Sequence, residues 1–444
     1  MTPRASAERS WTSFIDDIVG GHWIDPETGR NETVPYRSIV IAETLVDREC
    51  ELVASLGFGG MLAVVSDETT HEVMGRRVEA ALGKQFRIVS VVLDRPHADM
   101  FTVASVHERT AGADAVVAVG SGTINDLCKY ATFEDGKPYC VFATAPSMNG
   151  YTSTTASITL DSGFKTTFAA HAPAGVFIDL GVNASAPTRL KSAGLGDSLC
   201  RSTAQIDWWL SHRLFATEYA SLPFRLQAAD EPKMLEHAPG LPAGDPVAVA
   251  YLHRMLILCG FGVSSVGASH PGSMGEHQIS HYVDSFAGTR HPGTTHGQQV
   301  GVASLTMARL QHSLFDRDAP PTVAATRIDR AEIATRIGAE HADRCITEWS
   351  RKALDDAGAS ALNDKLVAMW PDLQREVRPM MLPVATMHDA LASAGGETTG
   401  EELGLEPQFY REAVLHAREM RNRYSVLDLL ADAGELDELA SREH

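Results

Sequence analysis

Residues 115–129 read Ala-Val-Val-Ala-Val-Gly-Ser-Gly-Thr-Ile-Asn-Asp-Leu-Cys-Lys, and this stretch decides the fold. Residues 115–119 are short and fully apolar, which is typical of a strand buried in a parallel sheet. Gly120-Ser-Gly122 then predicts a turn, and a helical pattern follows. Glycines let the backbone approach a diphosphate, and the N–H groups that open a helix bind its charge. We therefore predict a nucleotide-binding unit. A plain strand-to-helix turn remains the alternative, because the third glycine of the GxGxxG pattern is missing.

The segments on either side alternate between strand and helix patterns. Upstream, residues 61–67 form a short apolar run that ends in an acid, as a buried parallel strand does when it delivers a polar residue at its carboxyl end. Downstream, residues 144–153 are small and hydroxylated, which suits either a loop that wraps a ligand or an ordinary connector. The alternation predicts an α/β domain with a mostly parallel sheet. The other predicted strands are 34–41, 86–93, 138–143, 176–179 and a hairpin of 156–160 and 164–168, and the helices are 45–56, 70–82 and 100–110.

From about residue 185 the pattern changes to long helical segments. We predict helices over 196–214, 246–263, 276–284, 298–314, 330–342, 347–357, 361–370, 382–393 and 407–421. Trp208 and Trp209 are assigned to the core, and the acidic last 20 residues to a solvated helix or tail. The chain is long enough for two domains, so we expect an α/β domain over 1–183 and an all-helical domain over 184–444.

Residues 272–300 hold three histidines that could serve one metal site. His277 and His281 are four residues apart, so they share a face of a helix, and His296 lies in a turn that opens the next helix. A catalytic metal site usually adds a carboxylate to imidazole ligands, and Asp197 is the candidate. The chain has 18 histidines, so ordinary histidines remain the alternative at this point.

The composition limits the classes of function. The 444 residues are 44% hydrophobic and 21% charged, which excludes general disorder. The formal charge of −19 argues against a nucleic-acid partner, although one local Lys or Arg suffices for a phosphorylated metabolite. Six cysteines without a CxxC pair predict a reducing compartment. Residues 1–10 carry no apolar secretion signal and no apolar run reaches about 18 residues, so a cytoplasmic protein without a transmembrane helix is expected.

Five motifs, in this order, resemble the glycerol-1-phosphate dehydrogenases, which belong to the superfamily of iron-containing alcohol dehydrogenases, glycerol dehydrogenases and dehydroquinate synthases. They are Gly120-Ser-Gly-Thr-Ile-Asn-Asp, Thr144-Ala-Pro-Ser-Met-Asn-Gly, Gly196-Asp197, Glu276-His277-x-x-x-His281 and His296-Gly-x-x-Val. The resemblance spans roughly residues 35–310. It implies a Rossmann-like N-terminal domain and a helical C-terminal domain, with NAD(P) and one divalent metal (zinc, nickel or iron) in the cleft between them.

The resemblance also implies a role for each matching residue. Asp197, His277 and His296 match the metal ligands, and Asp197 and His281 are also placed in catalysis and substrate binding. Asp67 matches an acid that takes the adenosine ribose, which favours NAD over NADP because a carboxylate repels a 2′-phosphate. The residues expected to bind the cofactor are Asp67, Gly120, Ser121, Gly122, Thr123, Ile124, Thr144, Ala145, Pro146, Ser147 and Ser153.

One residue departs from the family's pattern. The family's loop usually reads Met-Asp-Gly, whereas this chain has Met148-Asn149-Gly150. The aspartate is expected to touch the substrate. Asparagine keeps its size and one oxygen, loses the charge and gains an N–H donor. Asn149 therefore bears on the identity of the substrate more than on the type of reaction.

The implied activity is a metal-dependent, NAD(P)-linked interconversion of dihydroxyacetone phosphate and sn-glycerol 1-phosphate. The metal would act as a Lewis acid, and His281 or a water would supply a proton, since histidine titrates near neutral pH. One alternative is a dehydrogenase of another polyol phosphate. Another is a dehydroquinate-synthase-like cyclase, which needs several basic residues where the loop and hairpin supply only Lys165. A non-catalytic binding protein is less consistent with a complete ligand set, and a homo-oligomer is a family-level expectation.

Overall fold

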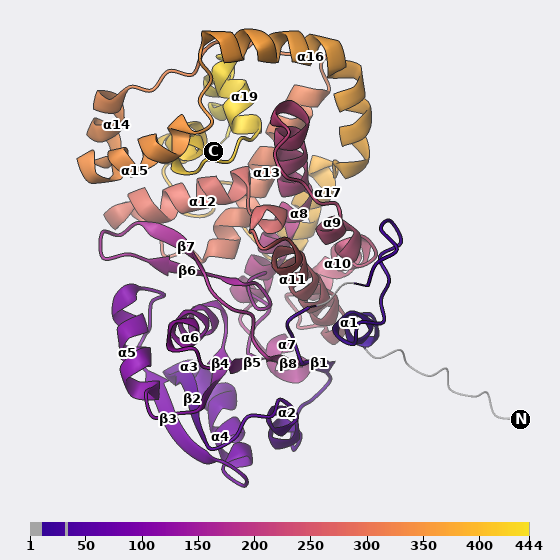
Figure 1. The fold of residues 1–444 in the computed structure, drawn as a ribbon, viewed down its shortest axis with the longest axis vertical. Helices are drawn as coiled ribbons and strands as arrows, with labels where there is room; N and C mark the ends of the chain where they lie inside the picture. Colours follow the sequence, from indigo (N-terminus) through magenta and orange to yellow (C-terminus); the bar gives the residue numbers. More distant parts are fainter. Residues whose placement is uncertain (1–10, 32–33, 444) are drawn as a thin grey trace, which may run out of the picture.

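The computed structural model describes residues 11–31 and 34–443, and the segment expected to lack a secretion signal, residues 1–10, lies outside them. Figure 1 shows an α/β part, in the purple colours of the N-terminal half, and a helical part in pink to yellow. The α/β part is built on a six-stranded sheet in the order β1-β8-β5-β4-β2-β3, and every neighbouring pair is parallel. The predicted fold class is confirmed. The strands are β1 (Ser38–Ala42), β2 (Met61–Asp67), β3 (Arg87–Leu93), β4 (Ala115–Gly120), β5 (Tyr139–Ala143) and β8 (Gly175–Asp179).

The central strands are covered on both faces. β4, β5 and β8 are buried along their whole length, as expected of apolar runs in a parallel sheet. The crossover helices lie between successive strands, and the segment between β2 and β3 contains a π turn, η1. These elements are α2 (Glu49–Ser55), α3 (Glu68–Thr70), η1 (His71–Gly75), α4 (Arg76–Leu82), α5 (Met100–Thr110) and α6 (Gly122–Asp135).

The predicted hairpin forms a separate antiparallel pair, β6 (Thr155–Thr159) and β7 (Lys165–Ala169). Figure 1 places it between the sheet and the helical part. The backbone N–H of Lys165 donates at 3.2 Å to Ser285 Oγ of the helix α12 (Gly275–Phe286). The hairpin therefore connects the two halves of the molecule next to the histidine-bearing helix.

From Leu180 onward the described chain up to Glu443 is helices and connecting turns, which agrees with the predicted helical half. The helices are α7 (Leu180–Ala184), α8 (Thr188–Phe215), α9 (Leu222–Gln227), α10 (Glu231–His237), η2 (Ala238–Gly240), α11 (Pro246–Val266), η3 (His270–Gly272), α12 (Gly275–Phe286), η4 (Gly288–Arg290), α13 (His296–Phe315), α14 (Arg330–Ile337), α15 (Ala339–Ser350), α16 (Asp356–Val377), η5 (Arg378–Met380), α17 (Val384–Ser393), α18 (Pro407–His416), η6 (Ala417–Met420), α19 (Val426–Asp432) and α20 (Leu436–Ala440). We propose the domain boundary at residues 183–184, after the last strand and before the long α8.

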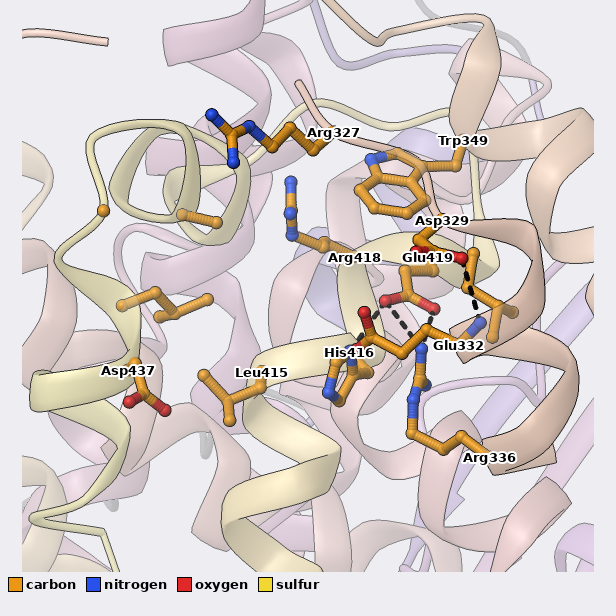
Figure 2. A pocket seen from close by; sticks show the side chains of 14 residues that line it. Arg327, Asp329, Glu332, Arg336, Trp349, Leu415, His416, Arg418, Glu419 and Asp437 are labelled. Carbon is orange, nitrogen blue, oxygen red and sulfur yellow. Dashed lines mark hydrogen bonds and ion pairs between the residues drawn. The ribbon is translucent and has the colours of Figure 1, made fainter. Parts of the chain in front are cut away.

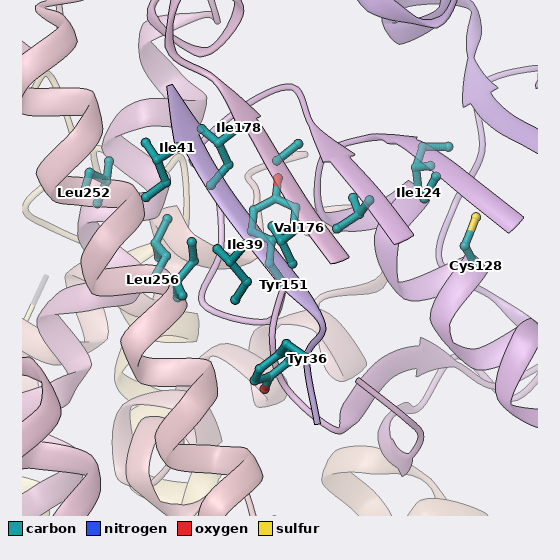
Figure 3. Close-up of a cluster of buried hydrophobic side chains, with 14 of the residues drawn as sticks. Tyr36, Ile39, Ile41, Ile124, Cys128, Tyr151, Val176, Ile178, Leu252 and Leu256 are labelled. Atoms are coloured by element: carbon teal, nitrogen blue, oxygen red, sulfur yellow. The ribbon is translucent and has the colours of Figure 1, made fainter. Parts of the chain in front are cut away.

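α11 is long and apolar enough to cross a membrane by length and composition, although the sequence predicted no such helix. However, 78% of its most apolar window is buried inside the molecule. In Figure 3, Leu252 and Leu256 of α11 lie beside Ile39 and Ile41 of β1, and all four belong to one apolar cluster. This helix is a core element that joins the sheet to the helical half.

Two helices predicted near residue 345 are wrong in their limits. The helix expected over 330–342 breaks at Gly338, whose φ of +86° is in the left-handed region that favours glycine. The helix expected over 347–357 ends at Ser350 instead. Two short helices, α9 and α10, were missed because each has fewer than eight residues and so shows little periodicity.

The predicted solvated tail is also wrong. α19 and α20 bury their leucines in the helical core, among them Leu430 and Leu436. Glu443 is 6% exposed, and one of its oxygens accepts from Arg309 Nε at 2.9 Å. The acidic composition of this segment hid an apolar face that only tertiary contact covers. The assignment of Trp208 and Trp209 to the core is confirmed, since they are 3% and 4% exposed.

Candidate metal and nucleotide site

Three helices bring Asp197, His277 and His296 together. One ligand atom from each lies within 4.8 Å of the other two. His277 Nε2 is 3.5 Å from Asp197 Oδ1, and the ring centroids of His277 and His296 are 5.0 Å apart. The three residues that the sequence proposed as ligands therefore converge, from α8, α12 and the start of α13.

The convergence depends on two glycines: Gly196 directly before Asp197 and Gly297 directly after His296. A Cβ on Gly196 would lie 2.4 Å from the carbonyl oxygen of Gly297, and one on Gly297 would lie 2.2 Å from the carbonyl oxygen of Ala193. Both distances are well inside van der Waals contact. α8 and α13 can therefore cross with their backbones touching, which puts Asp197, next to Gly196, close to His296, next to Gly297.

Neighbouring side chains orient both histidine ligands. His277 Nδ1 is 3.0 Å from Glu276 Oε1, and His296 Nδ1 is 3.0 Å from Ser280 Oγ. Each ring is thus held by one nitrogen, and the other nitrogen, Nε2, remains for a metal. Such outer partners are usual for metal-binding histidines, because they set the tautomer and the angle of the ring.

The electrostatics of this trio suit a cation. Burial lowers the pKa of His277, but the hydrogen bonds and charges of Asp197 and Glu276 outweigh it and raise the pKa overall. Burial lowers the pKa of His296 to about 4, so this ring is neutral and its lone pair is free. Cys200 also lies within reach of Glu276 and His277, but burial raises the pKa of its thiol well above the ordinary value. The Cys200 thiol donates to the carbonyl oxygen of Asp197 at 2.9 Å, and the residues present fit a divalent metal held by Asp197, His277 and His296.

His281 lies beside the trio and not in it. Its ring centroid is 5.5 Å from that of His296 and 6.4 Å from that of His277. Burial, followed by the charge of Arg421, holds the pKa of His281 well below its ordinary value. The expectation that His281 titrates near neutral pH is therefore wrong. The ring is neutral and can orient a hydroxyl group by a hydrogen bond.

A cavity of about 670 Å³ opens at the carboxyl ends of the strands, next to His296. The residues expected to bind a cofactor that do line it are Asp67, Ser121, Gly122, Thr123, Thr144, Ala145 and Ser147. Ser121 is the residue before α6, so the first N–H groups of that helix face the same region. A diphosphate fits such a helix start, and the structure supports the predicted nucleotide site here.

The other expected cofactor residues support this cavity from behind. A Cβ on Gly120 would meet Ile124 at 2.6 Å, so this pair makes the tight turn before α6. The carbonyl oxygen of Pro146 would lie 1.7 Å from a Cβ on Gly194, where the loop packs on α8. Ser153 accepts a hydrogen bond from Lys129 Nζ at 3.0 Å.

Asp67 and Asn149 each have an additional role in the structure. Asp67 Oδ1 accepts from the N–H of Thr70 at 2.7 Å, so it caps α3 while it lines the cavity. Asn149 contacts Asp197 twice: its backbone N–H donates to Oδ2 at 2.6 Å, and its side-chain Nδ2 donates to Oδ1 at 3.3 Å. An aspartate at position 149 could not make the second contact when ionised, because it has no N–H. The asparagine therefore orients the carboxylate proposed as a metal ligand.

Sequence reasoning missed two basic residues near this site, Arg421 and Arg423. Lys165, which was expected to be solvated or to reach a phosphate, lines the cavity and forms an ion pair with Asp284 at 3.4 Å. Arg421 places Nη2 3.4 Å from both ring nitrogens of His281, and Arg423 lies beside it. A cluster of three arginines within residues 418–423 of an acidic chain was the available signal, and it falls outside the span of the resemblance.

A second cavity, of about 370 Å³, lies in the helical half (Figure 2). Its basic residues include Arg336, whose Nη2 pairs with Glu419 at 2.7 Å, and His416, which pairs with the same carboxylate at 2.7 Å. Arg418 pairs with Asp432 at 3.3 Å. In each of these ion pairs a basic side chain is compensated by an acidic one. This cavity shares no lining residue with the cavity beside His296.

Comparisons with known proteins agree with the fold described above. A sequence model of the iron-containing alcohol dehydrogenases matches residues 40–187. The structure of a probable glycerol dehydrogenase from Sinorhizobium meliloti superposes with a TM-score of 0.61 at 16% identity and covers 92% of this chain and 98% of that one. The NADH-dependent butanol dehydrogenase A of Thermotoga maritima gives a TM-score of 0.61 at 14% identity, over 92% and 97% of the two chains. The fold is that of the class of iron-containing alcohol dehydrogenases.

Two curated relatives narrow the class. A glycerol-1-phosphate dehydrogenase (NAD(P)+) of Bacillus velezensis is 28% identical over 378 residues, which cover 83% of this chain and 84% of the relative. One from Thermococcus kodakarensis is 31% identical over 283 residues, 63% of this chain and 79% of the relative. The chain belongs to the glycerol-1-phosphate dehydrogenase family.

Proposed function

We propose that this protein is a metal-dependent, NAD(P)-linked dehydrogenase that interconverts dihydroxyacetone phosphate and sn-glycerol 1-phosphate. The observation that carries the proposal is the convergence of Asp197, His277 and His296 within 4.8 Å, with His296 also lining the proposed nucleotide cavity. The names of the curated relatives give glycerol 1-phosphate as the substrate, and dihydroxyacetone phosphate is the ketone formed by oxidation of its secondary hydroxyl group. We propose NAD as the preferred nucleotide, because Asp67 lines the cavity and a carboxylate repels the 2′-phosphate of NADP.

When bound, the metal supplies Lewis acidity and the nicotinamide supplies the site that accepts or donates hydride. The chain's own residues position these groups. Glu276 and Ser280 hold the two imidazole ligands, and Asn149 holds Asp197. His281, neutral at pH 7, orients the reacting hydroxyl, and a water carries the proton. Asp197 and His277 are only 1% and 4% exposed, so the chain would shield their side of the proposed metal site from bulk water.

The cyclase remains an outcome to be tested. A cyclase needs several basic residues, and the structure brings Arg421 and Arg423 to the region of the hairpin that carries Lys165. The dehydrogenase proposal therefore rests on the relatives and on the assay below. A dehydrogenase of another polyol phosphate is a further outcome, because Asn149 stands where the family usually has aspartate. A homo-oligomer remains a proposal on family-level grounds, and a cytoplasmic location remains one that rests on the cysteine pattern.

The experiment follows NADH absorbance in the presence of dihydroxyacetone phosphate and added zinc, nickel or iron(II), with unphosphorylated dihydroxyacetone as control. We expect oxidation that requires both the phosphate group and the metal, and chiral analysis should identify sn-glycerol 1-phosphate. Phosphate release from a sugar phosphate without net change of NADH would instead indicate a cyclase. NADH oxidation only with longer ketose phosphates would instead indicate a dehydrogenase of another polyol phosphate.

A further inference from the structure

Two arginines reach the site from the segment between η6 and α19. Arg421 Nη1 donates to Ser273 Oγ at 3.1 Å, and Nη2 donates to Thr167 Oγ1 of β7 at 3.0 Å. The same Nη2 lies 3.4 Å from the ring nitrogens of His281. Arg423 Nη2 donates to Ser269 Oγ at 2.8 Å, and Nη1 donates to the carbonyl oxygen of Ser273. All of these partners are uncharged groups.

Within the described residues, 11–31 and 34–443, no acidic side chain forms an ion pair with Arg421 or Arg423. In contrast, Figure 2 shows Arg336 joined to Glu419, from which it lies 2.7 Å away. Glu276 is the acid whose charge raises the pKa of both arginines. Its carboxylate oxygens already accept from the N–H of Met274 and from Thr203, and one of them contacts His277. Two positive charges therefore stand together with one acid that is already engaged.

The two groups are charged and partly enclosed. Burial lowers the pKa of Arg421 to about 10 and that of Arg423 to about 9, against the opposing charge of Glu276. Both remain protonated at neutral pH. An enclosed charge without a partner raises the free energy of the folded protein. An anionic ligand that pairs with these arginines would therefore gain more binding free energy than it would from the same contact in water. Arg421 lies beside His281, the residue that the resemblance places in substrate binding.

We propose that Arg421, supported by Arg423, binds the phosphate group of the substrate and thereby selects a phosphorylated polyol. This inference rests on the proposed function. A guanidinium offers paired N–H donors that match two phosphate oxygens, which a single ammonium group cannot do. The diphosphate of the nucleotide is expected at the start of α6, in a cavity that neither Arg421 nor Arg423 lines.

The test compares Arg421→Gln and Arg421→Lys with the wild type, as full-length, nickel-loaded protein. We expect Arg421→Gln to raise the KM for dihydroxyacetone phosphate about 10–100-fold, because a hydrogen-bonded charge is lost. The KM for NADH should stay unchanged. Arg421→Lys keeps the charge, so its KM for dihydroxyacetone phosphate should lie between those of the wild type and Arg421→Gln. The matched control is Arg344→Gln, which removes a charge that contacts the same hairpin at Thr166 but from an exposed position over Phe164. It should leave both KM values unchanged.

A second readout does not depend on turnover. Inorganic phosphate should raise the thermal midpoint of the wild type and of Arg344→Gln, and this rise should be lost in Arg421→Gln. A wild type that does not reduce dihydroxyacetone phosphate would refute the proposed function, and the phosphate titration would still decide the inference. The proposed role of Arg421 would be overturned if phosphate stabilised the wild type and Arg421→Gln equally, or stabilised neither. An unchanged KM for dihydroxyacetone phosphate in Arg421→Gln would also overturn it. If Arg421→Gln does not fold, Arg421→Lys decides by the same two measurements.

Discussion

His296 is the first residue of α13, and its two ring nitrogens have separate tasks. Nδ1 is held by Ser280, which itself donates to Gln299 Oε1 at 2.8 Å, so the ring cannot rotate freely. The other nitrogen points to the region shared with Asp197 and His277. His296 also lines the proposed nucleotide cavity, so the proposed metal and nucleotide sites adjoin at this residue.

We expect His296→Ala to remove metal binding and turnover together. The loss in metal affinity should exceed about 100-fold, since an outer-shell partner alone is typically worth about 10–100-fold. Metal content measured by mass spectrometry and NADH oxidation test this. His312→Ala is the control, because His312 lies on the same helix and contacts Asp316 and the carbonyl oxygen of Leu382. A His296→Ala protein that is fully active and metal-free would rule out the proposed mechanism.

At the scale of elements, the crossing of α8 and α13 builds the site. These two helices touch through Gly196, Gly297 and Gly301, and a Cβ on Gly301 would lie 2.9 Å from the Cα of Gly196. Larger residues would separate the helices and so separate Asp197 from His296. The site geometry is therefore a consequence of backbone contact as well as of the ligands themselves.

We expect Gly297→Ala to lower both stability and metal affinity. The added methyl group would lie 2.2 Å from the carbonyl oxygen of Ala193, and such overpacking typically costs about 1–3 kcal/mol. Chemical unfolding and a metal titration measure the two effects. For Gly112→Ala, no described atom lies within 4 Å of the new methyl group, so this control should change neither quantity. A Gly297→Ala protein with wild-type metal affinity would show that the crossing does not position the ligands.

At the scale of the whole molecule, the three proposed ligands tie together helices that are distant in the chain. α8 packs against α11, α11 packs against the sheet, and the hairpin contacts α12. A metal at the trio would therefore bridge elements that belong to one connected core. Without it, Asp197 and the buried histidines lose a shared counter-charge.

We expect metal to stabilise the whole chain in a single step. Adding metal at about 100 times its Kd should increase the free energy of unfolding by about 2.7 kcal/mol, as mass action requires for a ligand that binds only the folded state. Thermal unfolding in a chelator and after metal addition measures the shift. The His296→Ala protein should show no such increase, and an equal increase in both proteins would place the metal elsewhere.

Much of this protein could be inferred from local sequence patterns. The apolar run and Gly-Ser-Gly turn at 115–122 predicted a strand, a turn and a helix, and β4 and α6 are found there. The limits of β2 and α5 agree with the predicted segments residue for residue. Regular spacing carries this information, because a strand repeats every two residues and a helix every 3.6. The four-residue spacing of His277 and His281 likewise placed both on one helix.

The arrangement of the site was decided by tertiary structure. Local patterns say nothing about the crossing of α8 and α13 that brings Asp197 to His296, or about the return of Arg421 to the side of His281. The neutral state of His281 and the burial of the C-terminal helices are also properties of surroundings that form only on folding. The physical reason is common to all four. Desolvation, charge and close packing arise from residues distant in the chain, and no short window of sequence contains them.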